Sequence, residues 1–164
     1  MNLFSTRLIN LYIFLFCTAA MAIALYMQHA MGMEPCHLCI TQRVFYIAVG
    51  FTALAAFIHN PAAGGKLVYG SLVGLFALAG GGFALRQIYL QHLPADQVPA
   101  CGPSLGYMME EFPIMEVLSV MLSGDGNCAE ISWQDPLIGM SIPEWSLVAF
   151  IGLAAAGVYQ AIRK

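Results

Sequence analysis

Residues 8–33 read LINLYIFLFCTAAMAIALYMQHAMGM, and none of them is Asp, Glu, Lys or Arg. Three more uncharged windows follow, at 44–65, 67–85 and 145–162, and each is at least 18 residues long. An α-helix rises about 1.5 Å per residue, so about 20 apolar residues cross the hydrocarbon core of a bilayer. Because lipid cannot satisfy the polar groups of the backbone, the windows predict four membrane-spanning helices.

The composition of the whole chain agrees with this prediction. Of its 164 residues, 60% are hydrophobic and 9% are charged, and the mean hydropathy is +0.75. A soluble domain carries about 25% charged residues. A cleaved signal peptide is the alternative for the first window, but that window exceeds the about 7–15 apolar residues of such a signal. We therefore expect one integral membrane domain over residues 1–164, an all-α bundle with spans at about 8–28, 41–58, 67–90 and 144–162.

The few charges predict the orientation of the bundle. All nine acidic residues fall in or beside a short loop at about 29–40 and a long loop at about 91–143. Cytoplasmic loops carry the excess of Lys and Arg. We therefore expect both loops to be periplasmic and both termini to be cytoplasmic. The basic residues on the expected cytoplasmic side are Arg7, Lys66, Arg163 and Lys164.

Four of the five cysteines fall in the two expected periplasmic loops, where oxidising conditions allow disulfides. Cys17, within the first span, is expected to be an inert packing residue. Four cysteines allow three pairings, and Cys36–Cys39 with Cys101–Cys128 is the most economical. A zinc site is an alternative, although only the first pair is close in sequence. Purely structural disulfides suit the second pair better than the first, whose two-residue spacer closes almost no loop.

The motif Pro35-Cys36-His37-Leu38-Cys39 opens the second span. A cysteine in the first turn of a helix lies at the positive end of the helix dipole, which favours a thiolate. Cys36, Cys39 and Arg43 share one helix face. An arginine near the membrane boundary is costly without a partner, so we favour a functional role for Arg43 over simple snorkelling. A quinone carbonyl is a suitable partner, because its reduction places negative charge on the oxygen.

These residues resemble the family of disulfide bond formation protein B, the quinone-dependent thiol oxidases of the bacterial inner membrane. The resemblance covers nearly the whole chain, and it departs mildly at Gln42, where an acidic residue often precedes the arginine. The motifs that carry it are Gln28-His29 followed by Pro35-Cys36-His37-Leu38-Cys39-Ile40 and Arg43, Cys101 in a Pro-rich stretch, Cys128-Ala129-Glu130 with Trp133, and Pro143-Glu144-Trp145.

The resemblance implies a mechanism in which the four loop cysteines are catalytic. A DsbA-type periplasmic thiol oxidase would attack Cys101 of a Cys101–Cys128 disulfide, and Cys128 would then attack Cys36. Cys39 would meet the quinone beside Arg43. The resemblance also implies ubiquinone in preference to menaquinone, and neither a metal nor a nucleic acid.

Two histidines and one apolar segment are each compatible with two different roles. His37 would tune the motif or be a solvated loop residue. His92, after the third span, would contact the quinone or, as we slightly prefer, be an interfacial histidine. The segment 114–122, between Pro113 and Gly124, would be a helix on the membrane surface or on top of the bundle.

Two rival functions are compatible with four spans and paired cysteines. One is a vitamin K epoxide reductase-like enzyme, but the Cys-x-x-Cys motif of such proteins belongs to a late span, whereas here it opens the second. The other is a membrane scaffold whose disulfides only hold its loops. An assay of quinone consumption separates the scaffold from the oxidase.

Overall fold

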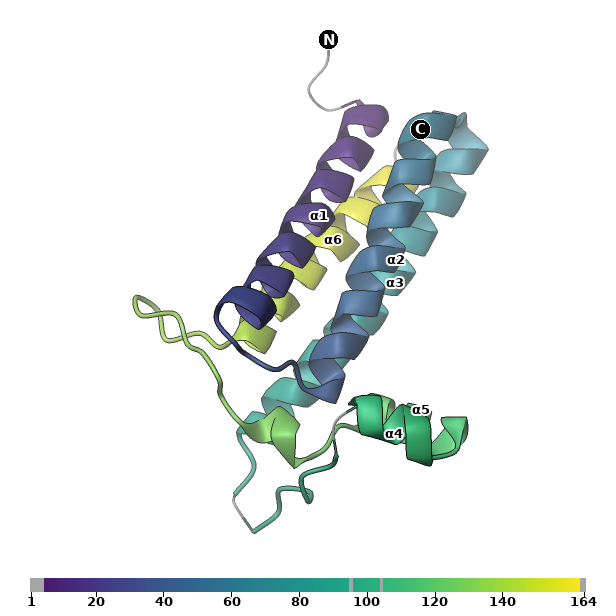
Figure 1. The fold of residues 1–164 in the computed structure, drawn as a ribbon. Coiled ribbons are helices and arrows are strands. Elements are labelled where there is room, and N and C mark those ends of the chain that lie inside the picture. Colours follow the sequence, from purple (N-terminus) through teal and green to yellow (C-terminus); the bar gives the residue numbers. More distant parts are fainter. Residues whose placement is uncertain (1–4, 95, 104, 163–164) are drawn as a thin grey trace.

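Four long helices run side by side in the computed structural model (Figure 1), which describes residues 5–94, 96–103 and 105–162. Each is long and apolar enough to span a membrane. The all-α, four-helix fold predicted from the uncharged windows is confirmed, while the expected cytoplasmic residues Arg163 and Lys164 lie outside the described range. The four helices are α1 (Thr6–Ala30), α2 (His37–His59), α3 (Ala63–Gln91) and α6 (Ile142–Ile162).

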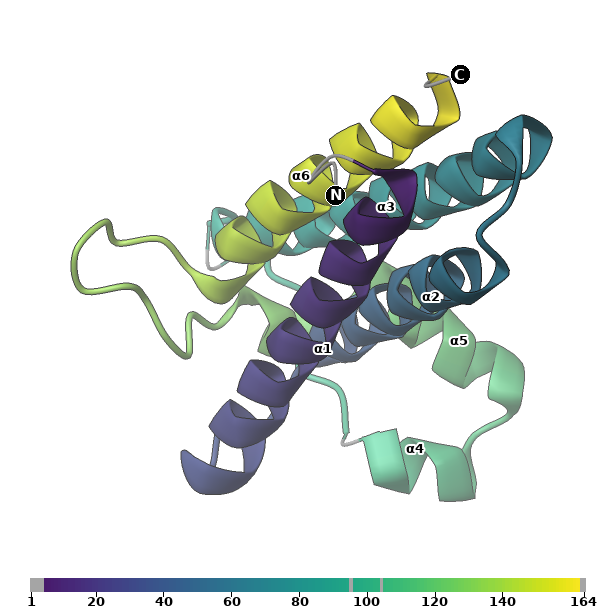
Figure 2. The ribbon, with the colours of Figure 1, turned by 90° about the horizontal axis from the view of Figure 1, so that it is seen from above.

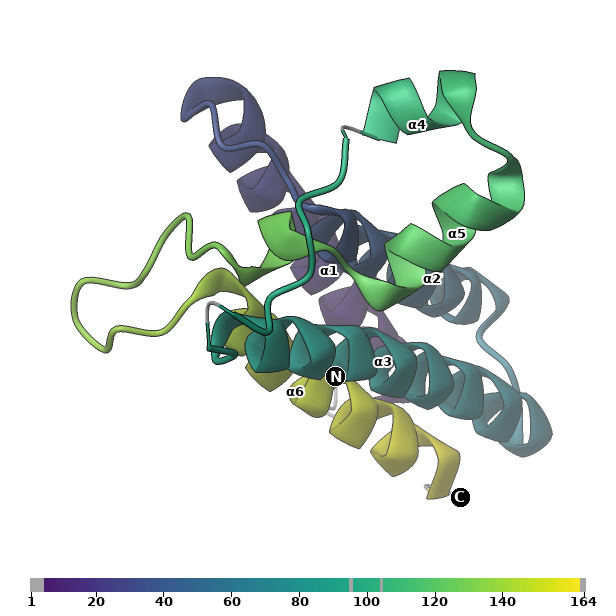
Figure 3. The same ribbon diagram turned by 90° about the horizontal axis from the view of Figure 1, so that it is seen from below.

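The two ends of the bundle differ in what they carry. One end, termed the turn end, holds the start of α1, the end of α6 and the tight α2–α3 connection (Figure 1). The opposite end, termed the loop end, holds the α1–α2 connection and the segments between α3 and α6. Three short helices lie there, namely α4 (Leu105–Glu111), α5 (Ile114–Ser123) and the 3-10 helix η1 (Gly126–Ala129). Figure 3 looks onto the loop end and shows α5 beside α2, with α4 farther out.

Local chemistry sets the bounds of α2. Cys36 is its N-cap, and the Cys36 sulfur accepts a hydrogen bond from the Cys39 N–H at 3.4 Å. At the turn end, Asn60 adopts a left-handed φ of 42°, which ends the helix. The helix starts at His37 rather than near residue 41. The uncharged window begins only after Arg43, but the helix extends further toward the N-terminus than the window does. The whole Cys-x-x-Cys motif is therefore held by α2.

Small residues bring α3 and α6 together, backbone against backbone. A Cβ on Gly70 would lie 2.7 Å from the Gly157 carbonyl oxygen. Nearer the loop end, Phe150 packs over Gly80 and stacks on Tyr46, with ring centroids 4.3 Å apart. These contacts join α2, α3 and α6. By contrast, α1 packs mainly on α2 and tilts away from α6 toward the loop end, as Figures 1 and 2 show together.

The predicted helix after Pro113 is confirmed as α5, which ends at Gly124 with a φ of 76°. One face packs on the bundle, because Val117 is buried and the Thr41 hydroxyl donates to the Met121 carbonyl at 2.9 Å. The other face is apolar and exposed, so α5 has features of both interpretations. The helix α4 was not predicted, since its seven residues are too few to show a helical period. The exposed apolar residues of α5 are Ile114, Met115, Leu118 and Leu122.

Candidate active site

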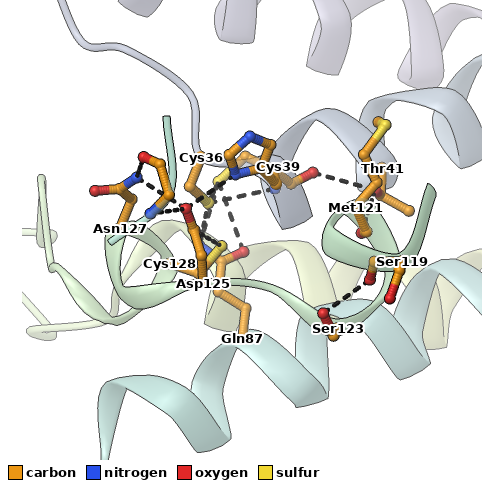
Figure 4. A network of polar contacts seen from close by, with 12 residues as sticks. Cys36, Cys39, Thr41, Gln87, Ser119, Met121, Ser123, Asp125, Asn127 and Cys128 are labelled. Atoms are coloured by element: carbon orange, nitrogen blue, oxygen red, sulfur yellow. Dashed lines mark hydrogen bonds and ion pairs between the residues drawn. The ribbon is translucent and has the colours of Figure 1, made fainter. Parts of the chain in front are cut away.

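Three of the four loop cysteines meet at the N-terminus of α2 (Figure 4). The Cys36 thiol donates to the Cys39 sulfur at 3.0 Å, and Cys36 also shares a hydrogen bond with Cys128. The backbone N–H of Leu38 donates to the Cys128 sulfur. Because the first N–H groups of α2 face these sulfurs, the site favours negative charge on sulfur.

The pKa values of Cys36 and Cys128 are shifted in opposite directions. Hydrogen bonds to Cys128 and Cys39, together with burial, raise the pKa of Cys36. The hydrogen bond from Cys36 lowers the pKa of Cys128, against the opposing effects of burial and of the Asp125 charge. A thiolate is the attacking species in disulfide exchange. The arrangement therefore favours a thiolate at Cys128, in contact with Cys36.

Cys101 stands apart from this cluster and is exposed. Its segment runs beside η1, where the Gly126 N–H donates to the Ala100 carbonyl at 3.2 Å. Only glycine fits there, because a Cβ on Gly126 would lie 2.4 Å from the Pro99 carbonyl oxygen and 3.0 Å from the Cys101 sulfur. The turn that carries Cys128 thus also holds Cys101 close by, although Cys128 faces the Cys-x-x-Cys motif.

Asp125 joins the segment of Cys101 to the motif. Its Oδ2 accepts hydrogen bonds from the Gly102 N–H and the Asn127 side chain, both at 2.9 Å. Its Oδ1 accepts from the Cys128 thiol at 3.4 Å. On the other side, His37 Nδ1 lies 3.2 Å from Oδ2, and both side chains are buried. One carboxylate therefore touches both loops of the loop end.

His37 and Asp125 face each other at ion-pair distance. Burial alone would raise the pKa of Asp125. The hydrogen bond from Gly102 and the contact with His37 outweigh burial and hold the pKa below its usual value. The interpretation of His37 as a solvated loop residue is wrong, because it is only 4% exposed.

A cavity of about 1190 Å³ lies between α1 and α6, next to the cysteine cluster. Its size suits a small-molecule ligand. Its lining includes exposed apolar residues of α1 and α6, among them Phe16, Ile23 and Trp145, so the cavity opens toward the face that lipid would cover. Its polar lining next to the sulfurs comprises Cys39, Gln42, Arg43 and Gln87.

Arg43 lines this cavity, and α1 fixes its position. One guanidinium nitrogen donates to Gln28 Oε1 and another to the Ala24 carbonyl at 3.2 Å. The other N–H donors of the guanidinium make no hydrogen bond to any residue that the structure describes, so they can serve a ligand. His92, in contrast, is exposed at the C-cap of α3, where its Nδ1 donates to the Ile88 carbonyl at 2.9 Å. It is absent from the cavity lining among the described residues.

Sequence reasoning missed two residues at the centre of the site, Gln87 and Asp125. Gln87 Nε2 donates to the sulfurs of Cys36 and Cys39 at 3.3 and 3.2 Å. Its position gave a signal, because a glutamine in a span is costly without a partner. Asp125 gave none, since it lies in a loop with several other acids.

The family model for disulfide bond formation protein DsbB matches residues 6–160. Disulfide bond formation protein B of Saccharophagus degradans is 50% identical over 160 residues, which cover 98% of this chain and 95% of that protein. The protein of the same name from Stutzerimonas stutzeri is 49% identical over 164 residues, or 100% of this chain and 99% of that protein. Disulfide bond formation protein B 1 of Pseudomonas aeruginosa is 46% identical over 164 residues, with the same coverage. The chain therefore belongs to the DsbB family, multi-pass membrane proteins with an oxidoreductase role in disulfide bond formation.

Proposed function

We propose that this chain reoxidises a DsbA-type thiol oxidase in the periplasm and passes the two electrons to a membrane quinone. The observation that carries the proposal is that Cys36, which contacts Cys128, and Cys39 line a cavity that opens beside exposed apolar residues of α1 and α6. The names of the relatives support the disulfide-forming half of the reaction. The quinone half rests on the chemistry of the cavity.

Each step of the exchange forms one sulfur–sulfur bond and breaks another. The partner's thiolate bonds to Cys101, and Cys128 leaves with the electron pair of the Cys101–Cys128 bond. Cys128 then bonds to Cys36, and Cys39 leaves as a thiolate. The partner's second thiol bonds to the partner's first sulfur and releases Cys101. Cys101 then bonds to Cys128 and displaces Cys36 as a thiolate, so Cys36 and Cys39 end as a dithiol. The lowered pKa of Cys128 and its contact with Cys36 support this direction.

The residues of the cavity fit a quinone. A bound quinone supplies a two-electron acceptor that also takes up two protons. Arg43 offers a fixed positive charge to an oxygen that becomes negative. Cys39 lines the same cavity and gives up the electron pair when the Cys36–Cys39 bond forms again. We propose ubiquinone in preference to menaquinone.

The distribution of charge supports an inner-membrane location with the loop end in the periplasm. Arg7 and Lys66 lie at the turn end, while the acidic residues gather at the loop end. Cytoplasmic loops carry the excess of basic residues. Cysteines at the loop end would then meet an oxidising compartment.

The test is an assay of the purified chain with a reduced DsbA-type protein and a soluble quinone. One quinone should be consumed for every two partner thiols, and faster with ubiquinone than with menaquinone analogues. Cys36→Ser and Cys39→Ser should each abolish quinone consumption. No turnover by a protein whose disulfides have formed would contradict the oxidase and favour a scaffold.

Arg43 is tested against Arg86, an exposed arginine of α3 that bonds to the Ser123 carbonyl. Arg43→His should raise the quinone concentration needed for half-maximal rate by about tenfold, as expected for loss of a charge-assisted contact. Arg86→His should leave it unchanged. Equal behaviour of the two variants would remove Arg43 from the quinone site.

A further inference from the structure

Gln87 is a buried polar residue of α3, only 3% exposed, whose side chain ends among the cysteine sulfurs (Figure 4). Its Nε2 lies 3.3 Å from the Cys36 sulfur and 3.2 Å from the Cys39 sulfur. A side-chain amide nitrogen carries two N–H donors, so one group can serve both sulfurs. Gln87 therefore touches the two atoms between which the disulfide of the motif forms.

A second glutamine fixes the orientation of this amide. Gln42 of α2, 4% exposed, donates from its Nε2 to Gln87 Oε1 at 2.7 Å. With its oxygen engaged by Gln42, the amide of Gln87 presents its N–H groups to the sulfurs. Gln87 Oε1 also lies 3.6 Å from the Cys39 sulfur, within reach of a protonated thiol. The amide can thus pair with Cys39 in either protonation state.

We infer that Gln87 is a catalytic residue whose amide receives the negative charge of Cys39 when that sulfur leaves the disulfide. The inference rests on the proposed function, in which Cys128 bonds to Cys36 and Cys39 departs with the electron pair. A thiolate accepts hydrogen bonds more strongly than a disulfide sulfur does, because a charged acceptor strengthens the bond. Gln87 therefore stabilises the reduced motif relative to the oxidised one.

Packing alone does not explain a glutamine at this place. A buried amide in a membrane span is costly unless hydrogen bonds satisfy it. Gln160 of α6 shows the contrast: it is equally buried, yet its Nε2 has no hydrogen-bond partner among the described residues. The amide of Gln87 is bound on both sides, by Gln42 and by sulfur.

The test measures the disulfide equilibrium of the motif without quinone or partner. Full-length chain with Cys101→Ser and Cys128→Ser is equilibrated with glutathione buffers of graded ratio at one pH. Alkylation after acid quenching then gives the fraction of Cys36–Cys39 disulfide. Gln87→Met keeps the side-chain length and removes both donors. It should favour the disulfide by about tenfold, or about 30 mV toward a more reducing potential.

The matched control is Gln160→Met, which replaces a buried glutamine far from sulfur and should leave the equilibrium unchanged. Gln42→Met removes the group that orients Gln87 and should shift the equilibrium in the same direction by about threefold. If Gln87→Met does not melt cooperatively, the Gln42→Met variant provides the test of the inference instead. Equilibria of the Gln87 and Gln42 variants that match the control would overturn the inference.

The inference and the proposed function fail in different ways. A shifted equilibrium without any quinone turnover would contradict the proposed function and leave Gln87 as a group that stabilises the reduced motif. Turnover by the native chain, together with an unshifted equilibrium in Gln87→Met, would contradict the role of Gln87 and support the proposed function. The rate of disulfide reduction by dithiothreitol is a second readout, and it should fall in Gln87→Met by up to about tenfold but not in Gln160→Met.

Discussion

The sulfur cluster at the N-terminus of α2 and the segment that carries Cys101 are built in opposite ways. In the cluster, Cys36, Cys39 and Cys128 are held among helix N–H groups and buried side chains. The segment of Cys101 is exposed, and it is tied down by Asp125 and by close contact with Gly126. A buried site fixes distances between sulfurs, whereas an exposed loop admits another protein. The cysteines therefore divide three to one, although their spacing in the sequence suggests two pairs.

The largest effect is expected from replacing Cys101, the exposed cysteine. Cys101→Ser should abolish oxidation of the DsbA-type partner, because Cys101 is the loop cysteine that lies exposed. Quinone consumption driven by dithiothreitol should continue at the native rate, because the small thiol reduces Cys36–Cys39 directly. Both rates are followed by quinone absorbance. Loss of both activities would show that Cys101 also serves the buried cluster.

Asp125→Ala removes the carboxylate that connects the two regions. Gly102 and His37 would lose their common partner, and an unpaired buried group costs about 1–3 kcal/mol. We expect partner-driven turnover to fall by about tenfold while dithiothreitol-driven turnover is retained. Asp96→Ala, an exposed acid of the same loop, is the control. An equal loss of both activities would mean that Asp125 only supports the fold.

Gly126→Ala sharpens the comparison by displacing one region without removing a polar side chain. The added Cβ would overlap the Pro99 carbonyl oxygen, so the segment of Cys101 must shift. Partner-driven turnover should fall by about fivefold, a cost typical of a modest local strain. Gly106→Ala is the control, because a Cβ there meets no atom within 4 Å. A rate equal to that of the control would show that the close approach is dispensable.

The fold was predictable and the division of the cysteines was not, for a physical reason. Lipid forces any long uncharged window into a helix, so α1 and α6 follow from local composition alone. Pro113 and Gly124 likewise mark the ends of α5. The contact of Cys128 with Cys36 joins two separate loops, and no periodicity records such a pairing.

The polar residues of the site show the same limit. His37 looked equally compatible with solvent, because its partner Asp125 lies in the other loop. Gln87 and Gln42 sit on different helices, and only the packing of α2 against α3 brings their amides together. A functional role for Arg43 was predicted because an arginine near the membrane boundary is costly without a partner. Part of that partner is Gln28 of α1, which sequence reasoning did not assign to it.

Acid should weaken the connection through Asp125. Its pKa is lowered in the folded protein, so its contribution to stability is present above the ordinary pKa of about 4 and is lost as the pH falls through the folded value. The melting temperature in detergent should fall more steeply below about pH 4 for the native chain than for Asp125→Asn. Above about pH 5 the difference between the two proteins should be constant. Parallel curves down to acid pH would contradict a charged Asp125 in the fold.

The smallest expected effect lies outside both regions. Cys17 is buried in α1 and packs against Gly50 of α2, away from the loop end. Cys17→Ser should leave partner-driven turnover and the disulfide pattern unchanged, because the thiol has no part in the exchange. Mass spectrometry of the alkylated chain checks the pattern. A changed pattern would bring Cys17 into the relay.

The most direct test of the three-to-one division asks which sulfurs join when only two loop cysteines remain. In a Cys17→Ser background, Cys39→Ser with Cys101→Ser leaves Cys36 and Cys128, and Cys36→Ser with Cys101→Ser leaves Cys39 and Cys128. After mild oxidation, disulfide mapping by mass spectrometry should find a Cys36–Cys128 bond in most molecules of the first protein and little Cys39–Cys128 bond in the second. Equal yields in the two proteins, or no Cys36–Cys128 bond, would contradict the placement of Cys128 against Cys36.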